Sequence, residues 1–162
     1  MKKAFLTLVT ILGLQLFANA QTEVPVITEL HTLMQHAKNN FVNEVGKIVE
    51  ADTATKMNYY ETKEHALAAD SFIIQVSSGQ NMYVLNYDMQ GDNLLKFAPL
   101  VEAYINELNA MVKTGNYTGE DYKNKTGKAV TDMTDKSGKL VLRYTSDAKS
   151  QTVYLYGFVD GK

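Results

Sequence analysis

The chain has 162 residues with no cysteine, and its 16 lysine and arginine residues against 18 aspartate and glutamate residues give a formal net charge of −2. The missing thiols exclude disulfides, cysteine nucleophiles and thiolate metal sites. Arg143 is the only arginine and no basic run is present. Binding to a nucleic-acid backbone needs a basic field, so we expect no nucleic-acid partner.

The N-terminus has the three parts of a secretory signal peptide. Lys2 and Lys3 precede an apolar run from Ala4 to Phe17, and Ala18-Asn19-Ala20 supplies small residues for cleavage. This pattern predicts export to the periplasm or the exterior, and no later segment is long enough to enter a membrane once the signal is removed. The predicted organisation is a cleaved signal peptide over 1–20, a flexible lead-in over 21–26 and a single α+β domain over 27–162.

The first half of the domain predicts one helix followed by three strands. Apolar residues recur at spacings of three and four from Ile27 to Val49, which indicates an amphipathic helix. Gly46 weakens its last turn by about 1 kcal/mol relative to alanine, so a break near 43–46 is an alternative. Strands are predicted over 57–63, 72–76 and 82–87, the last two joined by a hairpin turn rich in serine, glycine and asparagine.

The second half repeats this order. Leu94 to Lys113 carries the longest clean helical pattern, although Pro99 predicts either a later start or a kink. Residues 115–127 contain three glycines and no aliphatic side chain, which favours a loop. Three strands are then predicted over 128–134, 140–145 and 152–159.

The expected architecture is therefore a two-layer α+β sandwich, with an antiparallel sheet of about six strands and both helices on one face, in the order α-βββ-α-βββ. This order resembles the α-βββ-α-ββ arrangement of secretion-chaperone-like domains. Members of that group bind partner polypeptides, so the resemblance implies a binding role. Topology alone does not fix function.

Known catalytic and metal-binding patterns give little support for an enzyme. His31 and His36 are five residues apart, which places them about 140° apart on a helix, and the remaining histidine is His65. We therefore predict no metal, no cofactor and no catalytic residue. The carboxylates Glu61, Glu64 and Asp70 leave one alternative open, a carboxylate-dependent hydrolase of extracellular or cell-wall glycan.

Aromatic residues in the strands give the main functional hypothesis. The chain has ten tyrosines, and strand alternation separates aromatic from aliphatic side chains in two segments. The predicted binding residues are Tyr83, Tyr87, Tyr154, Tyr156 and Phe158. We expect them to form a tyrosine-rich sheet face for a protein, a peptide, a glycan or a second copy of the chain. The alternative is that tyrosine is simply a favourable strand residue that packs across strands.

Overall fold

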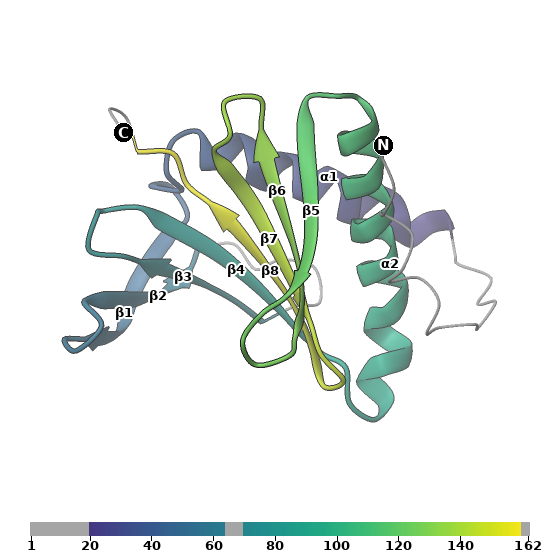
Figure 1. The fold of residues 1–162 in the computed structure, drawn as a ribbon. Helices are drawn as coiled ribbons and strands as arrows, with labels where there is room; N and C mark the ends of the chain where they lie inside the picture. The colour runs from purple at the N-terminus through teal and green to yellow at the C-terminus, as the bar shows by residue number, and fades with distance from the viewer. Residues whose placement is uncertain (1–19, 64–69, 160–162) are drawn as a thin grey trace.

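Figure 1 shows the computed structural model, which describes residues 20–63 and 70–159. The helices are α1 (Ala20–Ala37) and α2 (Asp92–Lys113). The strands are β1 (Val45–Asp52), β2 (Met57–Thr62), β3 (Asp70–Gln75), β4 (Asn81–Asp88), β5 (Tyr117–Lys123), β6 (Ala129–Asp135), β7 (Leu140–Ser146) and β8 (Ser150–Tyr156). The predicted α+β class with one antiparallel sheet and two helices is confirmed, but the sheet has eight strands rather than about six.

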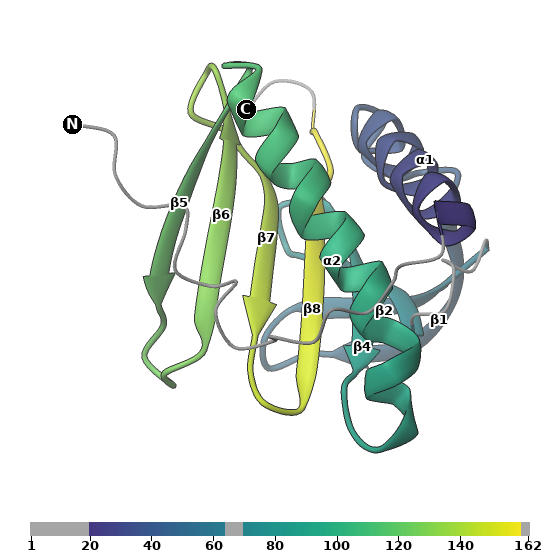
Figure 2. The same cartoon turned by 90° about the vertical axis from the view of Figure 1, so that its right-hand side faces the viewer.

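The sheet is continuous in the order β1-β2-β3-β4-β8-β7-β6-β5, and every neighbouring pair is antiparallel. Each half of the chain forms four consecutive strands, and the halves meet where β4 pairs with β8. Both helices lie over the same face of the sheet (Figure 2). The element order α-ββββ-α-ββββ has more strands in each half than the secretion-chaperone-like arrangement.

The core lies between the helices and the face of the sheet that they cover. Strand pairing aligns one inward row across six strands, formed by Tyr60, Ile73, Tyr83, Leu155, Leu142 and Met133. The helices contribute Leu30 from α1 and Leu100, Tyr104 and Leu108 from α2, all of them buried. Apolar faces from both layers thus form one hydrophobic cluster.

The helix predicted to reach Val49 ends at Ala37, and the segment from Val45 forms β1. Asn40 and Phe41 adopt left-handed backbone conformations with φ of 53° and 54°, which stop the helix. Gly46 lies in β1, where an added Cβ would be 2.7 Å from the carbonyl oxygen of Glu61. The glycine therefore permits close approach of two strands rather than weakening a helix.

The segment predicted as a loop over 115–127 contains a strand, β5. It pairs with β6 in unbroken register from Tyr117 opposite Asp135 to Lys123 opposite Ala129. Its side chains are mostly exposed, and β5 forms one edge of the sheet. An edge strand can therefore be polar, and hydrophobic patterning does not reveal it.

The helix boundaries also differ from those expected. α2 is one element with Pro99 inside it, and α1 begins at Ala20, so that residues 21–26 are helical. Residues 1–19 of the predicted signal peptide lie outside the described part of the chain. Neither described helix is long and apolar enough to cross a membrane.

Candidate functional site: the uncovered face of the sheet

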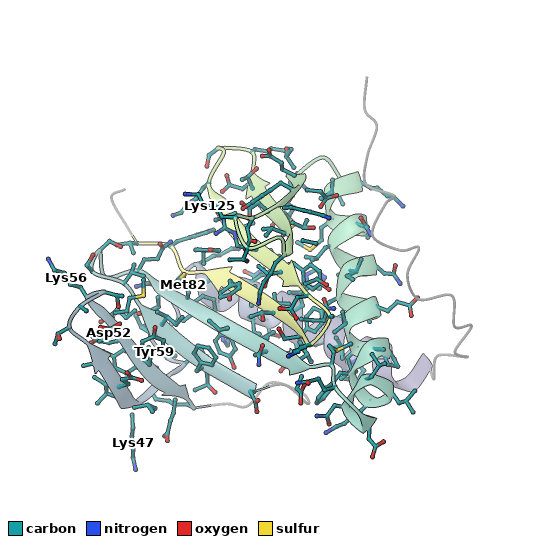
Figure 3. All side chains as sticks on the ribbon, turned by 60° about the horizontal axis from the view of Figure 1, so that its bottom comes forward. Lys47, Asp52, Lys56, Tyr59, Met82 and Lys125 are labelled. Carbon is teal, nitrogen blue, oxygen red and sulfur yellow. The ribbon has the colours of Figure 1, made fainter. Side chains whose placement is uncertain are left out.

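The uncovered face is the side of the sheet that points away from α1 and α2. Pairing aligns a row on this face across seven strands: Glu61, Phe72, Val84, Tyr154, Arg143, Asp132 and Glu120. A second row contains Tyr59, Ile74, Met82 and Tyr156. Figure 3 shows Tyr59 and Met82 on this face. Aromatic, aliphatic and charged side chains are therefore adjacent on one surface.

The middle of the uncovered face has a shallow depression of about 280 Å³. Its lining residues are Met82, Tyr122, Asn124, Val130, Arg143, Thr145, Tyr154 and Tyr156. Val84 and Val130 on the same face are only 1% and 3% exposed, although neither α1 nor α2 covers them. Neighbouring side chains must therefore exclude water from these valines. Tyr154, Tyr156 and Met82, each half-buried, are the large side chains placed to do so.

An ion pair fixes the polar part of the depression. Arg143 Nε donates to Asp132 Oδ1 at 2.6 Å, and Arg143 Nη2 donates to Asp132 Oδ2 at 2.8 Å. The Tyr122 hydroxyl donates to Asp132 Oδ2 at 3.1 Å. The bidentate contact raises the pKa of Arg143 further above its usual range. Partial desolvation and the hydrogen bond to Asp132 raise the pKa of Tyr122, so its hydroxyl stays protonated near neutral pH.

This arrangement holds three side chains in fixed orientations before any ligand arrives. A ligand that contacts Arg143 and Tyr122 loses less side-chain entropy than one that must order free side chains. Burial raises the pKa of the nearby Tyr156, which also remains a neutral hydrogen-bonding group. The site can offer apolar contact through the rings and hydrogen bonds through the hydroxyl and guanidinium groups.

Of the five predicted binding residues, only Tyr154 and Tyr156 lie on the uncovered face. Tyr83 and Tyr87 are 1% and 0% exposed on the opposite, helix-covered face. The register explains the difference, because Tyr83 lies opposite Leu155, which belongs to the core. The aromatic residues of β4 and those of β8 therefore point to opposite sides of the sheet.

The buried tyrosines are packed with other rings and hydrogen-bonding groups. The Tyr87 ring centroid is 5.6 Å from that of Phe97 and 6.0 Å from that of Tyr104. Burial raises the pKa of Tyr83, and hydrogen bonding to Ser71 partly offsets this effect. These tyrosines stabilise the core and are inaccessible to a partner molecule.

Phe158 lies beyond the end of β8 and belongs to neither of the two rows on the uncovered face. Its backbone N–H donates to the carbonyl oxygen of Ala37 at 2.7 Å, which ties the segment to the end of α1. Its ring packs against the hydrophobic core, and Lys139 Nζ lies 4.1 Å from the ring centroid. Continued strand alternation placed Phe158 with Tyr156 in the prediction, but β8 ends at Tyr156.

Sequence reasoning missed several residues of the uncovered face: Tyr59, Phe72, Tyr122, Asp132 and Arg143. Arg143 offered a signal, since the only arginine of the chain sits between the strand residues Leu142 and Tyr144. A charged side chain within a predicted strand usually marks its open face. The pairing that brings Asp132 next to it is a tertiary property.

The histidines and carboxylates considered for catalysis are dispersed. His31 Nε2 lies 2.7 Å from Glu107 Oε1, and His36 Nδ1 lies 2.7 Å from Glu44 Oε1. Glu61 and Asp70 are exposed, whereas Glu64 and His65 lie outside the described residues. Within residues 20–63 and 70–159, no group of three or more histidine, aspartate or glutamate residues is placed to hold a metal ion.

Comparison of the chain with models of known protein families, with curated proteins and with solved structures gives no match in any of the three.

Proposed function

We propose that the protein binds a partner molecule, which is a protein, a peptide or a glycan, through its uncovered face. One observation carries this proposal: half-buried aromatic side chains surround a prearranged Arg143–Asp132 pair on a sheet face that neither α1 nor α2 covers. Tyrosine, methionine and arginine are enriched where proteins bind one another. The signal-peptide pattern at the N-terminus supports an exported protein whose partner lies in the periplasm or outside the cell.

Binding is better supported than glycan hydrolysis by the chemistry of the depression. A glycosidase needs two carboxyl groups that converge on the scissile bond. Asp132 contacts two residues that line the depression, and both of its oxygens already accept hydrogen bonds from Arg143 and Tyr122. This occupation favours a structural role for Asp132 in orienting its neighbours.

The test uses the double substitution Tyr154→Ser and Tyr156→Ser. The wild-type protein is immobilised, bound molecules are recovered from the native envelope fraction, and the affinity of each recovered molecule is then measured with purified variants. If the two tyrosines form the centre of the interface, their loss weakens binding by about thirtyfold or more, as for central aromatic contacts.

A matched control removes an exposed apolar side chain from the opposite layer. Leu95 on α2 is 66% exposed and lies away from the uncovered face, so Leu95→Ser retains wild-type affinity. Urea unfolding of all variants verifies that they are folded. Equal affinity for the wild type, the control and the folded double variant would show that the partner binds elsewhere.

A further inference from the structure

The charges in and around the depression on the uncovered face are balanced. Among the described residues that line it, Arg143 is the only one with a formal charge, and its bidentate contact with Asp132 neutralises that charge. Lys128, which interacts electrostatically with the lining residue Tyr154, has its Nζ 2.6 Å from Asp147 Oδ2. An acidic or a basic ligand would lose hydration without gaining an unpaired counter-charge. The depression therefore favours a neutral ligand.

An exposed carboxylate at the edge of the sheet does not change this conclusion. Glu120 on β5 is exposed, lies opposite Asp132 and is not part of the lining. Ion pairs made by exposed side chains contribute little free energy, because water and salt screen them. Glu120 thus gives a basic ligand little advantage, and its negative charge repels an acidic ligand.

Polar groups with unused hydrogen-bonding capacity line the depression. Arg143 uses only Nε and Nη2 in its ion pair, which leaves Nη1 to donate to a ligand. Asn124 Oδ1 accepts three hydrogen bonds within its own turn, so the orientation of its Nδ2 donor is fixed. Within the described part of the chain, the hydroxyls of Tyr154 and Tyr156 form no hydrogen bond. A ligand rich in hydroxyl groups can use both the donors and the hydroxyls.

Aromatic rings supply the apolar part of the lining. Tyr154 lies opposite Arg143, and Tyr156 lies opposite Met82 on the other side of β8, so both rings share the depression. The face of an aromatic ring carries the negative part of its quadrupole. The C–H groups on the flat side of a sugar ring are slightly positive and apolar, and they pack on such a face while the sugar hydroxyls stay at the perimeter.

A peptide fits this position less well. Strands β4, β8, β7 and β6 are each paired on both sides, so their backbone groups are used within the sheet. An extended peptide lying on their face would find no strand edge for main-chain hydrogen bonds, and its own buried amides would lack partners. A helix binds through anchors spaced along a groove, whereas this site is a single shallow depression of about 280 Å³.

We propose that the depression binds a neutral glycan, which packs sugar rings against Tyr154 and Tyr156 and donates or accepts hydrogen bonds at Arg143 and Asn124. The inference rests on the proposed function and names the class of ligand for the same face. The volume is close to the lower end for small-ligand sites, which corresponds to about one or two sugar rings. The rest of a longer glycan chain extends into solvent.

Nuclear magnetic resonance titration of the ¹⁵N-labelled protein tests the proposal. The neutral probes are soluble oligosaccharides of glucose, mannose, xylose and N-acetylglucosamine, each added to about 10 mM, a range suited to weak binding. Oligogalacturonate is the acidic counterpart and oligoglucosamine the basic one. We expect at least one neutral probe to shift the amide signals of β7 and β8, and the charged probes to bind at least about tenfold more weakly.

Substitutions separate the ring contacts from the charge balance. Tyr154→Leu and Tyr156→Leu each weaken binding of the neutral probe about tenfold, whereas the corresponding phenylalanine variants, which keep the ring, retain most of the affinity. Asp132→Asn leaves the charge of Arg143 unbalanced, so the affinity for oligogalacturonate rises about tenfold. Glu102→Gln makes the same charge change at an exposed position of α2 and leaves both affinities unchanged. Urea unfolding verifies that each variant is folded, and if a leucine variant is not, the Asp132→Asn comparison still decides.

The outcomes distinguish the ligand class from the proposed function. Absence of binding by every neutral probe, tighter binding of a charged probe, or unchanged affinity in the folded leucine variants overturns the assignment of a glycan. The molecule recovered from the envelope fraction decides the proposed function separately. If its binding depends on Tyr154 and Tyr156 but is lost after protease digestion, the face binds a protein, and only the glycan assignment fails. Binding that survives protease digestion and is lost after periodate oxidation of sugar diols supports the glycan.

Discussion

Replacement of Asn81 by alanine tests the polar cluster that joins three distant parts of the chain. Asn81, at the start of β4, is only 2% exposed. Its Nδ2 donates to the carbonyl oxygen of Asn40 at 2.7 Å, and its Oδ1 accepts from Gln75 Nε2 at 3.1 Å. Its backbone oxygen accepts from the Gly157 N–H at 2.8 Å. One residue thus connects the segment after α1, the β3–β4 hairpin and the end of β8.

The substitution removes the two side-chain hydrogen bonds and keeps those made by the backbone. Each such bond contributes about 1 kcal/mol net, and a partner left buried without a hydrogen bond adds to the cost. We therefore expect Asn81→Ala to lower the free energy of unfolding by about 2–3 kcal/mol. For a domain of this size, that corresponds to a fall in Tm of roughly 6–10 °C.

Urea unfolding followed by circular dichroism measures the loss, with Asn43→Ala as the control. Asn43 is exposed, so its replacement changes the free energy of unfolding by less than about 0.5 kcal/mol. If Asn81→Ala and Asn43→Ala have the same midpoint, the hydrogen bonds of Asn81 do not stabilise the fold and the reasoning is refuted.

Two further predictions concern backbone packing and alkaline stability. Gly46→Ala brings a Cβ to 2.7 Å from the Glu61 carbonyl oxygen. We expect this overpacking to lower the free energy of unfolding, measured in urea, by about 1–3 kcal/mol. A rise in the free energy of unfolding would indicate that β1 and β2 separate freely. Burial raises the pKa of Tyr144 to about 12, above the ordinary value of 10.0, and also raises that of Tyr104. A raised folded-state pKa contributes stability that is complete below about pH 10 and is lost as the pH rises toward 12. Phenolate absorbance should therefore show that the exposed tyrosines ionise first. The buried tyrosines should ionise only when the far-ultraviolet circular dichroism signal is lost. Smooth ionisation of all ten tyrosines with an intact fold would contradict this.

Local patterns predicted the elements that bury an apolar side. The stripe of α2, the strands around β3, β4 and β6 to β8, and the antiparallel α+β class all follow from periodicity and turn chemistry. Hydrophobic patterning does not predict β5, because an edge strand buries little. The pattern over 45–49 predicts a helix where the structure has a strand, because valine and isoleucine at spacings of three and one suit a short helix and a short strand alike.

The sequence by itself determined which residues of a strand share a face, such as Tyr154 with Tyr156, since side chains alternate along any extended chain. Only the tertiary structure decided which face the helices cover and which strands are neighbours. The pairing of β4 with β8 buries Tyr83 and Tyr87 while it leaves Tyr154 and Tyr156 on the uncovered face. The pairing of β6 with β7 brings Asp132 to Arg143. A shift of one residue in either register would reverse these assignments, because the side-chain period of a strand is two.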